Sequence, residues 1–177
     1  MPPAEPQPPF PDWPRYAPGR VLPPYRFVPG LNPHPVSDPA GHSHGRRTER
    51  VDLPAPEGWA GSEPYRHAVD LHNFAYWWEA HEAWEGLWQL TDRRSPQAQF
   101  LQGLIQVSAG LLKAHLGQRE GAETLLTEAS ARLRRIPGPR YMGVDLPGHL
   151  AQVACCLDDL KRSTALPAGH LPMIRLS

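Results

Sequence analysis

The chain has 177 residues, enough for one ordinary domain, and its 23 prolines and 15 glycines exclude regular structure along the whole length. Lysine and arginine number 18, as do aspartate and glutamate, and this even balance weighs against nucleic acid as a partner. No segment approaches the roughly 18–20 apolar residues of a transmembrane helix, and the proline-rich start lacks the features of a signal peptide, so we expect a cytoplasmic protein without a membrane partner.

Residues 1–60 contain sixteen of the prolines and predict an extended segment without helices, because proline removes a hydrogen-bond donor and disfavours helix in the residue before it. The same segment carries six aromatic residues, which a purely disordered tail would lack. We therefore expect parts of this proline-rich N-terminal extension to lie against a folded surface.

The period of a helix begins at Ser62, a suitable N-cap, and continues to about Leu90. At 100° per residue, this predicted helix has a broad aromatic face with acidic residues at its edge. The aromatic face contains Phe74, Trp77, Trp84 and Trp88 together with His81, and the flanking residues are Trp78, Glu82 and Glu85.

A second helix is predicted from the Ser95-Pro96 pair to His115 or Leu116, before Gly117. Apolar residues cover more than a third of its circumference, which predicts a central, largely buried helix. Its remaining stripe is polar or small and holds Gln99, Gln102, Gly103, Gln106, Gly110 and Lys113. Two glycines seven residues apart favour the close approach of another backbone, although they are also tolerated in helices at a cost of about 1 kcal/mol each.

Further helices are predicted at about 119–135 and about 146–161, the latter after Asp145, while residues 165–177 have the pattern of a loose tail. No convincing strand pattern is present. The predicted fold is therefore all-α, a small bundle of about four helices in residues 61–164, between the N-terminal extension of residues 1–60 and the C-terminal tail.

The sequence His81-Glu82-Ala83-Trp84-Glu85 is similar to the H-E-x-x-H motif of metalloproteases with the second histidine replaced by glutamate. A spacing of four places His81 and Glu85 side by side on a helix, where both can bind one divalent metal ion, and Glu82 is then a candidate general base. Zinc usually takes at least three protein ligands, and no second pair of this kind completes the set. The alternative is that His81 packs among tryptophans and bonds to Glu85.

Gln102 and Gln106 are also four residues apart, and Lys113 follows two turns later. Facing the acids of the first helix, these side chains would form a polar ligand pocket with His81, Glu85 and Trp88. Burying such groups together is costly unless they satisfy one another or a ligand.

The other histidines are weaker candidates. His115 is expected in the core, whereas His67 and His72 are expected on the surface. His42 and His44 in the extension offer a second set of metal ligands, but a solvated turn is favoured there. If this tract folded back over the first helix, it would supply the ligands that the His81 motif lacks.

Three segments in order, at residues 73–88, 100–106 and 113–122, resemble the bacterial and archaeal "domain of unknown function 309" family. The resemblance spans about residues 65–135 and implies a small all-α bundle but no reaction. The residues that match its H-E-x-x-E-x-x-W and Q-G-L-I-Q elements are His81, Glu82, Glu85, Trp88, Gln102, Gly103 and Gln106.

Two functions follow as hypotheses. In the first, the polar pocket binds a small polar ligand or a divalent metal, and metal-assisted hydrolysis with Glu82 as the base is the corresponding reaction. In the second, the same residues form an interhelical hydrogen-bond network in a non-catalytic module, whose helix hairpin or N-terminal extension binds a partner protein or a second copy of the chain.

Overall fold

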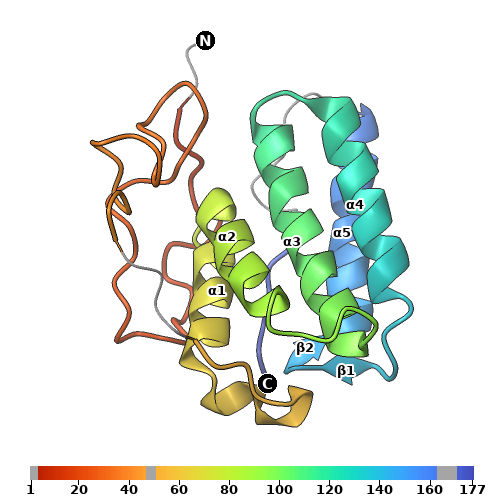
Figure 1. Ribbon diagram of the computed structural model, residues 1–177. Helices are drawn as coiled ribbons and strands as arrows, with labels where there is room; N and C mark the ends of the chain where they lie inside the picture. Colours follow the sequence, from red (N-terminus) through yellow and green to blue (C-terminus); the bar gives the residue numbers. More distant parts are fainter. Residues whose placement is uncertain (1–3, 47–50, 163–170) are drawn as a thin grey trace.

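The computed structural model describes residues 4–46, 51–162 and 171–177. It is mostly helical, which confirms the predicted all-α class (Figure 1). The elements in chain order are the 3₁₀ helix η1 (Pro56–Gly61), α1 (Glu63–Asn73), α2 (Trp77–Trp88), α3 (Pro96–His115), α4 (Arg119–Leu133), the strands β1 (Arg140–Tyr141) and β2 (Val144–Asp145), and α5 (Leu146–Arg162). In the described parts of the chain, no helix is both long enough and apolar enough to cross a membrane.

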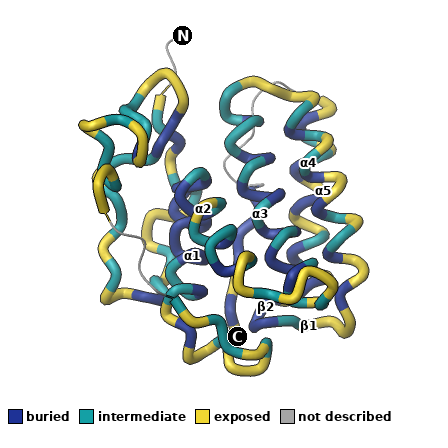
Figure 2. Tube along the Cα trace, viewed as in Figure 1, coloured by how far each residue is buried: buried dark blue, intermediate teal, exposed yellow. Residues whose placement is uncertain are grey.

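Helix α3 is the centre of the bundle, as its wide apolar face predicts. It packs against α2 on one side and α4 on the other, while α1 packs on α2 and α5 on α4. The helices turn their buried faces toward one another (Figure 2). Gly103 and Gly110 let α4 approach α3, because a Cβ atom at either position would come within 3.0 Å of a leucine side chain of α4.

The prediction of one helix from Ser62 to Leu90 is wrong. Ser62 is the N-cap of α1, and its hydroxyl accepts the N–H of Tyr65, but α1 ends at Asn73 and α2 begins at Trp77. The 3₁₀ helix η1 also corrects the expectation that no helix occurs before residue 60, since proline is tolerated at its first position.

The break between α1 and α2 depends on a backbone conformation that an alanine adopts. Ala75 has a positive φ of 64° and donates its N–H to the carbonyl of His72, while Tyr76 donates to the carbonyl of Leu71. These two hydrogen bonds form a Schellman motif, in which glycine is the usual residue at the left-handed position. Because the chain has alanine there, the sequence carries no local signal for the break.

The N-terminal extension lies along α1 and α2, which confirms that parts of it pack on a folded surface (Figure 1). Phe27 and Val28 are buried, and the Arg26 guanidinium donates to the carbonyl of Phe74. The Tyr76 hydroxyl donates to the carbonyl of Pro23. Aromatic residues therefore attach a segment whose described residues have no regular structure before η1.

The end of the chain is not a loose tail where the structure describes it. Residues 165–170 of the predicted tail lie outside the described residues, but Ile174 is fully buried and Leu176 bridges to Val144 of β2. The apolar side chains of this segment are buried, and its backbone bonds to Asn73 of α1 and Gln152 of α5. A sequence of only seven residues has too little periodicity to predict such packing.

Candidate functional site

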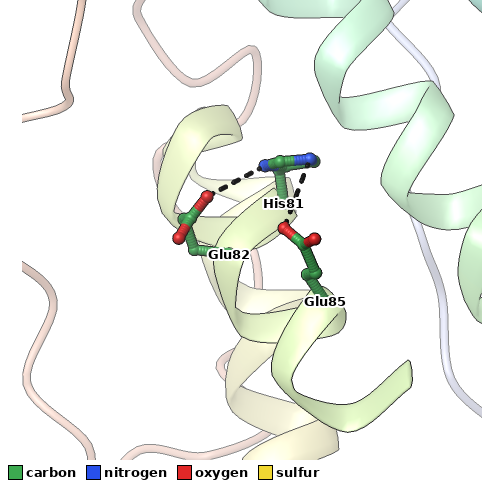
Figure 3. Close-up of side chains that lie close together, drawn as sticks. All are labelled: His81, Glu82 and Glu85. Carbon is green, nitrogen blue, oxygen red and sulfur yellow. Dashed lines mark ion pairs between the residues drawn. The ribbon is translucent and has the colours of Figure 1, made fainter. Parts of the chain in front are cut away.

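Three side chains of α2 form a polar cluster, which we call the α2 cluster: His81, Glu82 and Glu85 (Figure 3). Nδ1 of His81 lies 3.3 Å from Oε1 of Glu82, and Nε2 lies 3.9 Å from Oε2 of Glu85. The side chains are 31%, 46% and 41% exposed, respectively. The sequence correctly predicted that His81 and Glu85 lie side by side, because four residues make about one helical turn.

One nitrogen and two carboxylate oxygens of the α2 cluster lie within 4.8 Å of one another. Such atoms can converge on one cation after small side-chain rotations, and a set of imidazole and carboxylates suits Mn²⁺, Fe²⁺ or Zn²⁺. Three protein ligands leave positions open for water or a ligand. In the described part of the chain, the cluster includes no ligand from another element.

A cavity of about 360 Å³ adjoins the α2 cluster, between α2 and α3. His81 belongs both to the cluster and to the cavity wall. Most of the wall is apolar, including two indole rings, and the polar side chains are few. The lining residues are Pro29, Trp77, Trp78, His81, Ala109, Leu112, Lys113, Leu116 and Gln118.

Of the predicted pocket residues, the structure brings only His81 and Lys113 to this cavity. Gln106 is turned toward α4 instead, where its amide donates to Oε2 of Glu128 at 2.8 Å and accepts from Nε of Arg132 at 3.0 Å. Arg132 also donates to Gln99. The polar stripe of α3 was correctly identified, but the helix that it faces is α4, because the close approach at the two glycines puts α4 on that side.

Three further predicted pocket residues, Glu85 of the α2 cluster, Gln102 and Trp88, also lie outside the cavity lining. Gln102 is half-buried on α3. Trp88 is half-buried at the end of α2, where the guanidinium carbon of Arg93 lies 3.4 Å from a ring centroid of the indole. This stacking is a cation–π contact.

The histidine-rich tract of the extension folds back over α2, but it does not reach the α2 cluster with a ligand. Nε2 of His42 lies 3.2 Å from Oε1 of Glu79, and both side chains are almost fully buried. Burial raises the pKa of the Glu79 carboxyl, and hydrogen bonds from the Phe27 N–H and His42 oppose that shift. The ring of His34 packs edge-on against Trp78. The tract thus fastens the extension to the helix that carries the cluster.

The sequence missed a second polar group at the C-terminal end of α1, which we call the α1 polar end: Asp70, His72 and Asn73. All three are buried, including His72, which was expected on the surface. Burial lowers the pKa of His72 to about 3, so the ring is neutral. It donates from Nε2 to the carbonyl of Pro172 and accepts at Nδ1 from Ser108.

Both side chains of this histidine–serine pair are buried, and their hydrogen bond joins α1 to α3. His115, expected in the core, is half-buried and bonds to the carbonyl of Ala4 in the extension. The side chains of the α1 polar end have partners in the first part of the chain, at residues 15–17, and in the last, at residues 172 and 174. A local pattern therefore did not identify this group.

The family described as "Domain of unknown function (DUF309)" matches residues 65–125. This part of the chain is similar to that family. The DUF309 match spans nearly all of α1, all of α2 and α3, and the first half of α4, and so includes the α2 cluster and most of the cavity wall. No curated protein matches the chain.

Proposed function

We propose that the chain binds a divalent metal ion through His81, Glu82 and Glu85. The supporting observation is the convergence of one imidazole nitrogen and two carboxylate oxygens within 4.8 Å on one turn of α2. Two carboxylates beside one another repel, and a cation relieves that repulsion. The cluster is only partly desolvated, so a metal ion would enter without a large rearrangement of the core.

The open positions of the ion would bind a small ligand from the adjoining cavity, since His81 lies in the wall of that cavity. For hydrolysis, the bound metal would supply a water molecule with a pKa lowered toward about 7. Glu82 is the most exposed of the three side chains, so where His81 and Glu85 alone hold the ion, Glu82 is our candidate for the base that accepts the proton.

Titration of tag-free, EDTA-treated protein with Mn²⁺ tests the proposal, with the free ion measured by electron paramagnetic resonance. We expect about one bound ion per chain and a loss of at least about tenfold in affinity for His81→Ala and for Glu85→Ala. His44→Ala is the matched control, because His44 is an exposed histidine of the extension. Unchanged affinity in a folded His81→Ala, Glu85→Ala double variant would refute the proposal.

A second candidate, a non-catalytic interaction module, is favoured by one specific observation. The side-chain amide of Gln106 is bonded to Glu128 and Arg132, so this part of the predicted pocket acts as an interhelical network. In this alternative the α3–α4 hairpin or the N-terminal extension binds a protein partner or a second copy of the chain. Light scattering coupled to gel filtration tests self-association: a mass near 19.7 kDa at all concentrations would reject a second copy.

A further inference from the structure

The cavity between α2 and α3 has the size and lining of a small-molecule site. Its volume of about 360 Å³ lies within the range of roughly 300–1,000 Å³ that is typical of ligand pockets. The indoles of Trp77 and Trp78 and the side chains of Leu112 and Leu116 contribute apolar walls. Such walls favour a flat, apolar ligand body, because aromatic surfaces gain from stacking or edge contacts as well as from burial.

A lysine, Lys113, stands in this wall, and none of the carboxylates that the structure describes pairs with it. Lys113 is half-buried, and its Nζ donates to the neutral side chain of Gln118 at 3.0 Å. Among the described residues, no carboxylate lies within ion-pair distance of Lys113. Gly121 of α4 is so close to the lysine stem that a Cβ there would come within 2.9 Å of Cδ, so the stem is held against α4.

We propose that this cavity binds a small organic anion with a flat apolar body. The body packs between the indoles and the leucines, and the anionic oxygens accept charge-assisted hydrogen bonds from Lys113, stronger than the bond that the neutral amide of Gln118 provides.

The position of His81 links this site to the α2 cluster. The carboxylates of Glu82 and Glu85 lie next to the cavity and repel an anion until a cation neutralises them. Bound metal and bound anion therefore strengthen one another, and by linkage each raises the affinity for the other by the same factor. This coupling rests on the proposed metal site, whereas the binding of the anion at Lys113 does not.

Isothermal titration calorimetry with 2-naphthoate, in EDTA, tests the cavity by itself. We expect 2-naphthoate to bind at least about tenfold more tightly than the neutral 2-naphthalenemethanol, and Lys113→Met to remove this preference. Lys161→Met is the matched control, since Lys161 is 62% exposed on α5, and it should leave the affinity unchanged. Ala109→Leu, which fills the cavity without altering a charge, should abolish the binding of both compounds.

Thermal unfolding establishes that each variant is folded before it is titrated. Equal affinities for the acid and the alcohol, an unchanged affinity in Lys113→Met, or no binding of millimolar 2-naphthoate would each overturn the assignment. Repeating the titration with Mn²⁺ in place of EDTA should raise the affinity for 2-naphthoate severalfold. Naphthoate binding without Mn²⁺ binding rejects the metal site alone, and Mn²⁺ binding without naphthoate binding rejects the anion site alone.

Discussion

The α1 polar end and the α2 cluster contain similar side chains, yet their surroundings differ completely. At the α1 polar end, the carboxylate, imidazole and amide are buried and bonded to the N-terminal extension, to α3 and to the C-terminal segment. In the α2 cluster, the imidazole and carboxylates are about one-third to one-half exposed and, among the described residues, form ion pairs with one another alone. The difference teaches that polar residue types do not identify a site by themselves. One set is buried and hydrogen-bonded to other parts of the fold, whereas the other is partly exposed to solvent.

The largest effect is expected for Asp70→Ala. The Asp70 carboxylate is fully buried and accepts hydrogen bonds from Arg15 and from the backbone N–H groups of Tyr16 and Ala17. Removing it breaks the ion pair with Arg15 and leaves the two N–H groups without their acceptor, so the free energy of unfolding should fall by about 3–5 kcal/mol. Urea denaturation measures this loss. Asp158→Ala, at a side chain that is 59% exposed, should change stability by less than about 0.5 kcal/mol.

A smaller loss, of about 2–3 kcal/mol, is expected for Asn73→Ala. The Asn73 amide donates to the carbonyl of Ile174 at 2.7 Å and accepts its N–H at 2.8 Å, all of them buried. Hydrogen exchange should show loss of protection at the Ile174 amide before the rest of the bundle opens. Asn73→Asp retains the acceptor but places a buried carboxylate oxygen against the carbonyl of Ile174, so it should cost at least as much as Asn73→Ala. A smaller loss in Asn73→Asp would contradict this explanation.

Acidification should lower the free energy of unfolding through two buried histidines, His72 of the α1 polar end and His149 of α5. Burial lowers the pKa of His72 to about 3 and that of His149 to about 4, compared with 6.5 in the unfolded chain. Below pH 6.5 the unfolded chain therefore binds more protons, so the stability present above pH 6.5 falls as the pH decreases toward 4. The slope is on the order of 1 kcal/mol per pH unit for each histidine.

Comparing wild type with His72→Gln isolates this contribution. Burial also raises the pKa of Glu79, so its protonated form contributes stability that is lost as the pH rises. This contribution is the same in wild type and in His72→Gln, so it cancels in the comparison. Urea denaturation at pH 7.5 and pH 5.5 should show a smaller acid-induced loss in His72→Gln. Parallel losses in the two proteins would show that His72 does not contribute.

The smallest effect on stability is expected in the α2 cluster. His81→Ala removes only partly exposed ion pairs, which contribute about 0–1 kcal/mol, yet it should remove most Mn²⁺ binding. Thermal unfolding and Mn²⁺ titration of the same sample measure the two effects. A loss of stability as large as that of Asp70→Ala would show that the α2 cluster stabilises the fold, as the α1 polar end does.

Local sequence patterns were sufficient for much of the fold. Ser95 caps α3 through a bond from the Ala98 N–H, and Gly117 takes the positive φ that follows the helix, as the Ser-Pro and glycine signals predicted. The small hairpin at β1 and β2 escaped prediction because its two-residue strands are too short for an alternating pattern. Its turn uses Met142 and Gly143 at positive φ, and only the glycine is a recognisable signal.

The sequence likewise predicted only part of the candidate site. His81 and Glu85 could be paired from sequence because their spacing on one helix fixes their proximity. The cavity could not be predicted, because Pro29, α2 and α3 meet there only after the extension has folded back. Gln106 was placed on the correct stripe of α3 but assigned to the wrong neighbour, since a helical period gives the direction of a side chain and not what it meets.

The sequence by itself determined the helical class, the central place of α3, the stripe of small and polar residues along it, and the cluster on one turn of α2. All of these follow from periodicities within a single helix. Only the tertiary structure decided which polar groups are buried, which helix faces the stripe, and where the two ends of the chain pack. Those outcomes depend on contacts between residues up to 160 positions apart, such as the bond from the Leu176 N–H to the Tyr16 hydroxyl, and no local pattern encodes such a contact.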